Sequence, residues 1–183
     1  MAHSAAGKLL GLATDGPWYE AAFVAGMTNA LNVVADGLSP SGQPLLAPAQ
    51  ETEELTALYD EIRDYFQVKD LPAPFGVLGR DPGYLRDFWS AYQRAFEEGG
   101  LSQRFKEALA FAVSLTTRSA FGTELHLTRM RQLGVGDKGV LEVVGVTQMF
   151  SSYTKIADVL QLEPDMGHIA PQDHSPPPGG KKD

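Results

Sequence analysis

The sequence predicts an all-α protein. Apolar residues recur at intervals of three and four along most of the 183 residues, which is typical of amphipathic helices. No sustained alternation of polar and β-branched residues is present, and no Asn-Gly or Asp-Gly turn joins two alternating segments. The helices can therefore be placed in order from their start and stop signals.

The N-terminal part predicts two helices separated by a loop. Asp15-Gly16-Pro17 is typical of a helix start, and the mostly apolar helix over 18–35 ends at Asp36-Gly37. Residues 38–50 contain three prolines and are expected to form a loop. Apolar residues return at helical spacing over 51–66, where the acidic residues on the other faces indicate a solvated surface.

The remainder predicts four further helices after a short turn at 75–78. Pro82 starts a helix that ends before Gly99-Gly100, because proline is tolerated in the first helical turn. Ser102 is expected to cap the next helix. Helices over 123–133 and 137–162 follow. The last is apolar on most sides, so we expect it to be buried on two sides, by its own domain and by a second subunit.

These elements divide the chain into three parts. We expect an N-terminal helix with its Pro-rich loop over 1–50, a helical domain over 51–163, and a Pro/Gly-rich tail over 164–183. The tail is expected to lack structure of its own and to be the segment that contacts a protein partner. Asp165 and His168 lie in this tail, where a metal site is not expected.

Composition and charge exclude several classes of function. The chain has no cysteine, which removes disulfides, zinc–thiolate sites and thiol catalysis. Its formal net charge of -8 disfavours nucleic acid and anionic membranes as partners. The apolar run at 9–13 is too short for a signal peptide or a membrane span, so a cytoplasmic protein is expected. No cofactor and no metal are expected. Two strongly apolar helices predict a homo-oligomer.

His126 is the histidine that a helix would hold in place. Ser119, Gly122 and His126 are spaced i, i+3, i+7 and share one helix face if the helix extends that far back. Glu107 on the preceding helix can meet this face, and a carboxylate beside an imidazole is a recurring arrangement for general acid–base catalysis. The alternative is a structural histidine whose hydrogen bonds are satisfied in the core.

The same residues resemble a known motif. Glu107, eleven residues, Ser119-Ala120-Phe121-Gly122, three residues and then His126 resemble the core of the carboxymuconolactone decarboxylase and alkylhydroperoxidase D-like superfamily. There a glutamate precedes a Cys-x-x-Cys-x-x-x-His segment at this spacing. The likeness covers about 70–162 and implies the helical bundle of that superfamily and an oligomer.

The departure from the motif is as informative as the match. Ser119 and Gly122 stand at the two cysteine positions, so the thiol peroxidase chemistry of one branch is excluded. The retained Glu107 and His126 are similar to the decarboxylase branch, in which a small anionic lactone is handled without a redox pair. Glu124-Leu125-His126 also resembles the Glu-Leu that precedes the histidine in that branch.

Two functions of different class remain open. In the first, an enzyme acts on a small organic acid or lactone, with His126 as general acid or base and Glu107 as its partner. Arg118 or Arg129 would bind a substrate carboxylate and Phe121 would wall the pocket, while Ser119 is a less favoured candidate nucleophile. In the second, the chain is a redox-dead structural or assembly subunit. A cavity at the pair favours the enzyme, and a void is expected beside Ser119 and Gly122.

Overall fold

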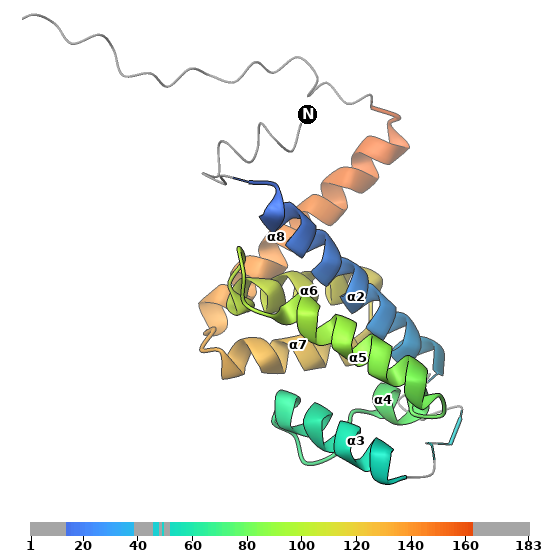
Figure 1. The fold of residues 1–183 in the computed structure, drawn as a ribbon. Coiled ribbons are helices and arrows are strands. Elements are labelled where there is room, and N and C mark those ends of the chain that lie inside the picture. Colours follow the sequence, from blue (N-terminus) through green and yellow to red (C-terminus); the bar gives the residue numbers. More distant parts are fainter. Residues whose placement is uncertain (1–13, 39–45, 48, 50–51, 163–183) are drawn as a thin grey trace, which may run out of the picture.

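The computed structural model describes residues 14–38, 46–47, 49 and 52–162 (Figure 1). Within these residues all regular secondary structure is helical, which confirms the predicted all-α class. The predicted tail over 164–183 lies outside the described residues, as does most of the predicted loop over 38–50. The helices are α2 (Gly16–Leu38), α3 (Glu53–Phe66), α4 (Ala73–Leu78), α5 (Pro82–Phe96), α6 (Gln103–Thr117), α7 (Ala120–Gln132) and α8 (Asp137–Val159).

Side-chain caps fix where several helices begin. The Ser102 hydroxyl accepts a hydrogen bond from the Phe105 N–H, as the sequence predicted. Ser119 caps α7 in the same way by accepting from the Gly122 N–H. This cap explains why α7 begins at Ala120, one turn earlier than the predicted start at 123.

An aromatic core holds α3, α4 and α5 together. Tyr65 on α3 lies edge-on to Trp89 on α5, with their ring centroids 5.1 Å apart. Trp89 and Tyr92 are 2% and 0% exposed and belong to this core. Other buried members of this core are Tyr59, Ile62, Phe66, Phe75, Leu85, Phe88 and Phe96.

The N-terminal helix α2 packs across α5, α6 and α7. Glu20 fastens it by accepting hydrogen bonds from the Gly100 and Leu101 N–H groups at 2.7 and 3.1 Å. The buried Lys106 ammonium lies 2.9 Å from the same carboxylate. Thr28 and Asn32 are also buried on the packed face of α2, so this face is not purely apolar.

Of the described residues, only those of α2 form a helix long and apolar enough to cross a membrane. Core helices of soluble proteins meet the same criteria of length and composition. Signal sequences meet them too, and 28% of the most apolar stretch of α2 is buried against the other helices.

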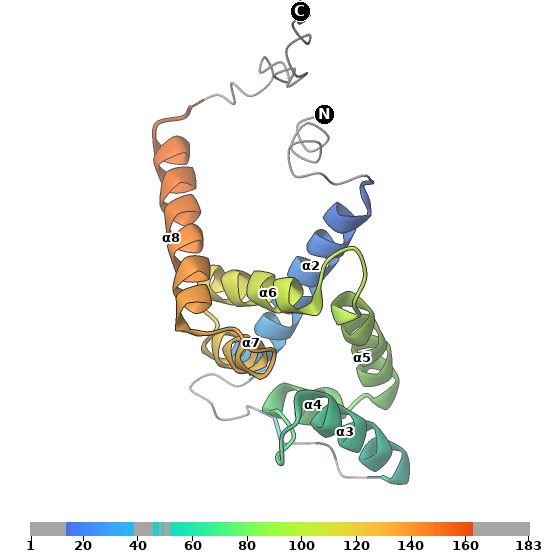
Figure 2. The same ribbon diagram turned by 90° about the vertical axis from the view of Figure 1, so that its left-hand side faces the viewer.

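The last helix, α8, lies at one edge of the molecule (Figure 2). It contacts α6, and its C-terminal half extends past the other helices. None of its residues is buried in the single chain. Cover by its own domain is therefore limited to the face that contacts α6, and cover by a second subunit stays a prediction.

Candidate functional site

Glu107 and His126 meet at the packing interface of α6 and α7. The His126 Nδ1 atom lies 2.8 Å from the Glu107 Oε2 atom, within hydrogen-bonding distance. Both side chains are 0% exposed. The predicted convergence of the two residues is confirmed, because a connection of only Arg118 and Ser119 folds α7 back onto α6.

Arg129 is the third ionisable member of this buried group. Its Nε atom lies 3.5 Å from the Glu107 Oε1 atom, and its guanidinium sits over the Tyr65 ring, 5.0 Å from the centroid. The same guanidinium donates a hydrogen bond of 2.7 Å to the Gln132 side chain. With 7% of its surface exposed, Arg129 is held within the protein by partners on three sides.

The imidazole of His126 is oriented by its neighbours. Its ring stacks on Phe96 with centroids 5.6 Å apart and planes inclined by 10°. When Nδ1–H donates to the Glu107 carboxylate, the neutral ring presents Nε2 as an acceptor on its other edge. In the described part of the chain this buried Nε2 atom has no hydrogen-bond partner.

The two tyrosines nearest the pair are kept neutral. Burial raises the pKa of Tyr65 to about 12, and the Glu107 carboxylate acts in the same direction. Burial also raises the pKa of Tyr92 well above its ordinary value, again with a contribution from Glu107. A negative charge in low-polarity surroundings disfavours a second negative charge nearby. Both hydroxyls therefore remain protonated across the physiological range.

The space beside Ser119 and Gly122 is filled by α2. A methyl group added at Gly122 would lie 2.0 Å from the Asn32 Oδ1 atom and 2.5 Å from the Ser114 Oγ atom. The Ser119 hydroxyl donates to the Asp36 carboxylate at 3.1 Å and is itself buried. The expected void is therefore wrong, because a polar side chain from outside the motif occupies it. Ser119 acts as a helix cap in this arrangement.

Asn32 is a residue that the sequence analysis did not single out. Its amide donates to the Ser114 and Thr117 hydroxyls, each at 3.1 Å, and its Oδ1 atom approaches Gly122. The available signal was a polar residue in the mostly apolar stretch 18–35, which also contains Glu20, Thr28 and Asn29. A polar residue on the buried face of a helix needs a partner, and here the partners come from α6.

The predicted substrate-binding residues line different pockets. Phe121 and Arg129 share a pocket of about 170 Å³ with Glu124, Leu125 and Thr128. Arg118 instead lines a pocket of about 630 Å³ between α6 and α8. The three residues therefore do not converge on one cavity.

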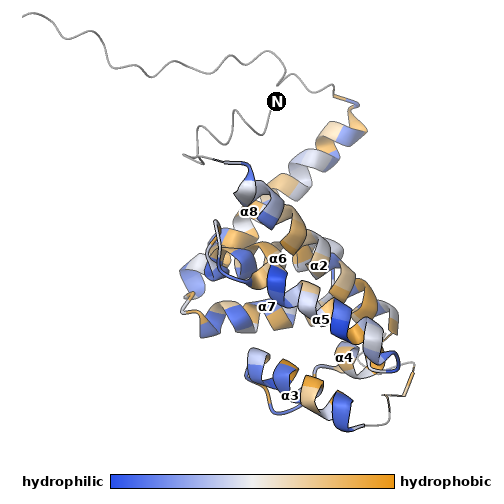
Figure 3. Cartoon of the chain, viewed as in Figure 1, coloured by the Kyte–Doolittle hydropathy of each residue, from blue (hydrophilic) through white to orange (hydrophobic). Residues whose placement is uncertain are grey.

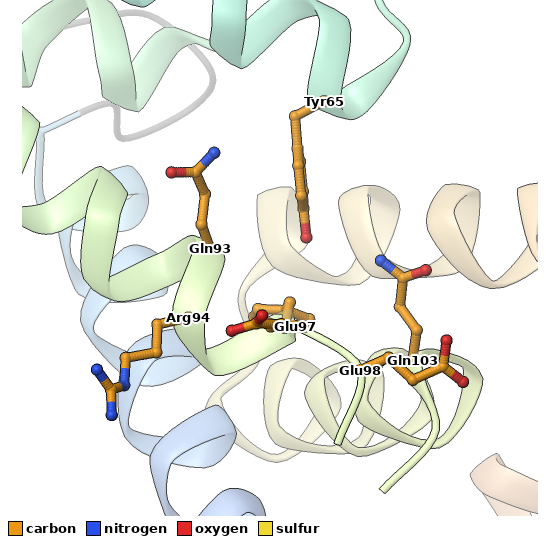
Figure 4. A pocket seen from close by; sticks show the side chains of 7 residues that line it. Tyr65, Gln93, Arg94, Glu97, Glu98 and Gln103 are labelled. Atoms are coloured by element: carbon orange, nitrogen blue, oxygen red, sulfur yellow. The ribbon is translucent and has the colours of Figure 1, made fainter.

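A further pocket, of about 510 Å³, lies over the aromatic side of the site (Figure 4). Tyr65 points into it from α3, and Gln93 and Gln103 face it from α5 and α6. Its wall also contains Phe96, the ring that covers His126. Neither Glu107 nor His126 lines this pocket or the two described above. No group of three His, Asp or Glu side chains suited to a metal occurs among the described residues.

The described helices form an all-α arrangement with a buried carboxylate–imidazole pair on successive helices. Residues 82–162 match the carboxymuconolactone decarboxylase family, which confirms the resemblance predicted from the motif. The protein is therefore carboxymuconolactone decarboxylase-like and lacks the cysteine pair. Helices α5 to α8 lie within the match, whereas α2, α3 and α4 precede it. No curated protein and no solved structure matches the chain.

Proposed function

We propose that this carboxymuconolactone decarboxylase-like protein is a structural or assembly subunit. In this proposal the Glu107–His126 pair ties α6 to α7 and catalyses no reaction. The observation that carries the proposal is the closed site: both side chains are 0% exposed, and Asn32 fills the space at Gly122. A substrate would have to displace packed side chains to reach His126.

The energetics of a buried charged group fit a structural role. Ionised side chains lose hydration when buried, and each needs a partner to offset that loss. Glu107 obtains partners from His126 on one oxygen and Arg129 on the other. Removing one member leaves the others unpaired. Replacing all of them by apolar side chains of similar volume removes the need for charged partners.

Substitution of the group tests the proposal through stability. Glu107→Met alone is expected to lower the free energy of unfolding by about 3–5 kcal/mol, since Arg129 and His126 lose their partner. The combined variant Glu107→Met, His126→Phe, Arg129→Met is expected to recover most of this loss. Urea denaturation followed by circular dichroism measures both. A triple variant that is no more stable than Glu107→Met would contradict the structural role.

The second candidate is the acid–base enzyme on a small organic acid or lactone, which the unpaired Nε2 atom of His126 favours. A panel of short-chain carboxylic acids and their lactones separates the two functions. For a structural subunit no compound raises the melting temperature and none is consumed. Saturable stabilisation or turnover that is lost in His126→Gln, with Gln148→Glu on α8 as the control, would establish the enzyme instead.

A further inference from the structure

The pocket between α8 and the C-terminal end of α6 holds polar side chains that the Glu107–His126 site does not use. We call it the α6–α8 cleft. Its volume of about 630 Å³ lies within the range of pockets that enclose small molecules. Residues of both helices form its wall, and those with polar side chains include Thr116, Arg118, Thr147, Ser151, Thr154 and Lys155.

The face of α8 that borders the cleft changes from apolar to hydroxyl-bearing. Val144, Thr147, Ser151 and Thr154 are spaced by three and four, so they follow one another on one side of the helix. Figure 3 shows weakly polar residues, drawn white to pale blue, among the apolar residues of α8 where it extends past the other helices. Because α6 ends at Thr117, the hydroxyl-bearing part of this face borders an open cleft.

The charge that lines the cleft is positive. Among its described lining residues Arg118 and Lys155 are cationic and none is acidic. The Arg118 guanidinium forms no ion pair with another described residue. The Lys155 Nζ atom lies 3.8 Å from the exposed Asp158 carboxylate. The C-terminal end of α6 contributes only about half a negative charge. In a chain with net charge -8, the cleft is therefore a local site for an anion.

Arg118 is attached to the cleft at a defined backbone position. Its φ of 60° lies in the left-handed region, where glycine is the usual residue at a helix end of this kind. Its backbone N–H donates to the Ser114 and Leu115 carbonyls and closes the last turn of α6. The connection to α7 is only two residues long, so both of its ends are held by helices.

The threonine hydroxyls indicate what else the ligand contains. Thr116, Thr147 and Thr154 each donate to a backbone carbonyl of their own helix, at 2.8, 2.7 and 3.0 Å. Since the hydroxyl hydrogens are used in this way, the oxygens remain as acceptors. A bare anion has no hydrogen to offer to such oxygens. A ligand that satisfies the whole cleft therefore combines an anionic group with hydroxyl groups.

We propose that the α6–α8 cleft binds a small phosphate monoester that carries hydroxyl groups. Arg118 and Lys155 bind the phosphate, and the threonine oxygens accept hydrogen bonds from the hydroxyl groups. A phosphate monoester has a charge of roughly -1.5 to -2 at pH 7, which two cations match, whereas a carboxylate has a single charge. The inference goes beyond the proposed structural role of the Glu107–His126 pair and does not depend on it.

A phosphate that belongs to a membrane or a nucleic acid fits this chain less well. Both are extended polyanions, and the net charge of -8 opposes the approach of the chain to either of them. A small ester brings one anionic group into the cleft and leaves the acidic remainder of the surface in water. We therefore assign the site to a soluble ligand.

Isothermal titration calorimetry of the full-length chain with glycerol 3-phosphate is the first test. We expect saturable binding with a dissociation constant below about 1 mM, weaker binding of inorganic phosphate and none of glycerol. Arg118→Gln and Lys155→Gln should each weaken binding about tenfold, because each removes charge-assisted hydrogen bonds. Glutamine suits position 118, since Gln67 adopts the same left-handed backbone with φ 56°. Lys138→Gln removes an equal charge from the first turn of α8 and is the matched control, with unchanged affinity.

Asp158→Asn tests the proposal in the opposite direction. It removes the carboxylate that competes for Lys155, so glycerol 3-phosphate should bind more tightly. The proposal is overturned if glycerol 3-phosphate does not saturate, or if Lys138→Gln weakens its binding as much as Arg118→Gln. Equal affinity for inorganic phosphate would overturn the role of the threonine oxygens. Co-sedimentation with phosphatidic acid vesicles that Arg118→Gln abolishes would overturn the assignment to a soluble ligand. His126→Gln should bind glycerol 3-phosphate as the wild type does, so this test and that of the Glu107–His126 pair can fail separately.

Discussion

At the scale of single residues, Gly122 is a point of close approach between α7, α2 and α6. A β-carbon at this position would overlap the Asn32 amide of α2 and the Ser114 hydroxyl of α6. We therefore expect Gly122→Ala to lower the free energy of unfolding by about 2–3 kcal/mol, since overpacking displaces well-packed neighbours. Urea denaturation monitored by circular dichroism measures the change.

Gly26 provides the matched control for Gly122. It also lies within a helix, but a β-carbon there would meet no atom within 4 Å. Gly26→Ala should stabilise the protein by up to about 1 kcal/mol through helix propensity alone. Adding Asn32→Ala to Gly122→Ala should recover part of the loss. Equal stabilities for Gly122→Ala and Gly26→Ala would show that the close approach of α2 is not rigid.

The residues of the candidate site differ in how far the sequence predicts them. The Glu107–His126 contact follows from motif spacing, because a short connection brings two successive helices together. Asn32 donates to Ser114, 82 positions away in sequence, and no periodicity links them. Arg129 was predicted to bind substrate, yet it pairs with Glu107. Which of several nearby cations pairs with a buried carboxylate depends on tertiary packing.

At the scale of elements, Glu20 attaches α2 to the turn between α5 and α6. Glu20→Gln is expected to cost about 2–4 kcal/mol of stability, because the substitution removes a charge that two N–H groups and the buried Lys106 share. The control is Glu98→Gln in the same turn, where the carboxylate is exposed and little change is expected. A loss no larger than that of the control would mean that α2 is held by its apolar contacts alone.

The Glu20 contact also predicts a dependence on pH. The hydrogen bond from Lys106 holds the pKa of Glu20 below its usual value of 4.5, and the Leu101 and Gly100 N–H groups add to this effect. The contribution of Glu20 to stability is therefore complete above pH 4.5. It is lost as the pH falls through the lowered pKa that Glu20 has in the folded protein. In acid, the difference in stability between the wild type and Glu20→Gln should shrink.

Helix boundaries show what local sequence decides. Pro82 and the Ser102 cap place the starts of α5 and α6 where they were predicted, since these signals act over one turn. The environment of α8 was not predicted, because its composition indicates burial without specifying what covers it. The exposure of α8 is a property of packing between elements, which local sequence does not determine.

At the scale of the whole molecule, α2 lies outside the residues that match the family but packs against the Glu107–His126 site inside them. The match begins at residue 82, yet Asn32 and Asp36 of α2 contact Ser114, Thr117 and Ser119 inside the match. The all-α class could be predicted from periodicity alone. The placement of α2 over Ser119 and Gly122 could not, because it results from contacts between segments about 80 residues apart.

The absence of cysteine from the whole chain leads to a prediction about activity. Thiol peroxidases use a thiolate to attack the peroxide O–O bond, and a second thiol then converts the sulfenic acid to a disulfide. The chain has no thiol, and thioether oxidation of its five methionines gives sulfoxides, which a dithiol cycle of this kind does not regenerate. We expect cumene hydroperoxide consumption with dithiothreitol to equal that of a buffer blank. Asn32→Ala, which enlarges the space at Gly122 without adding sulfur, should also match the blank. A rate that rises in proportion to wild-type protein concentration would contradict the prediction and would require a peroxide-reducing group other than a thiol.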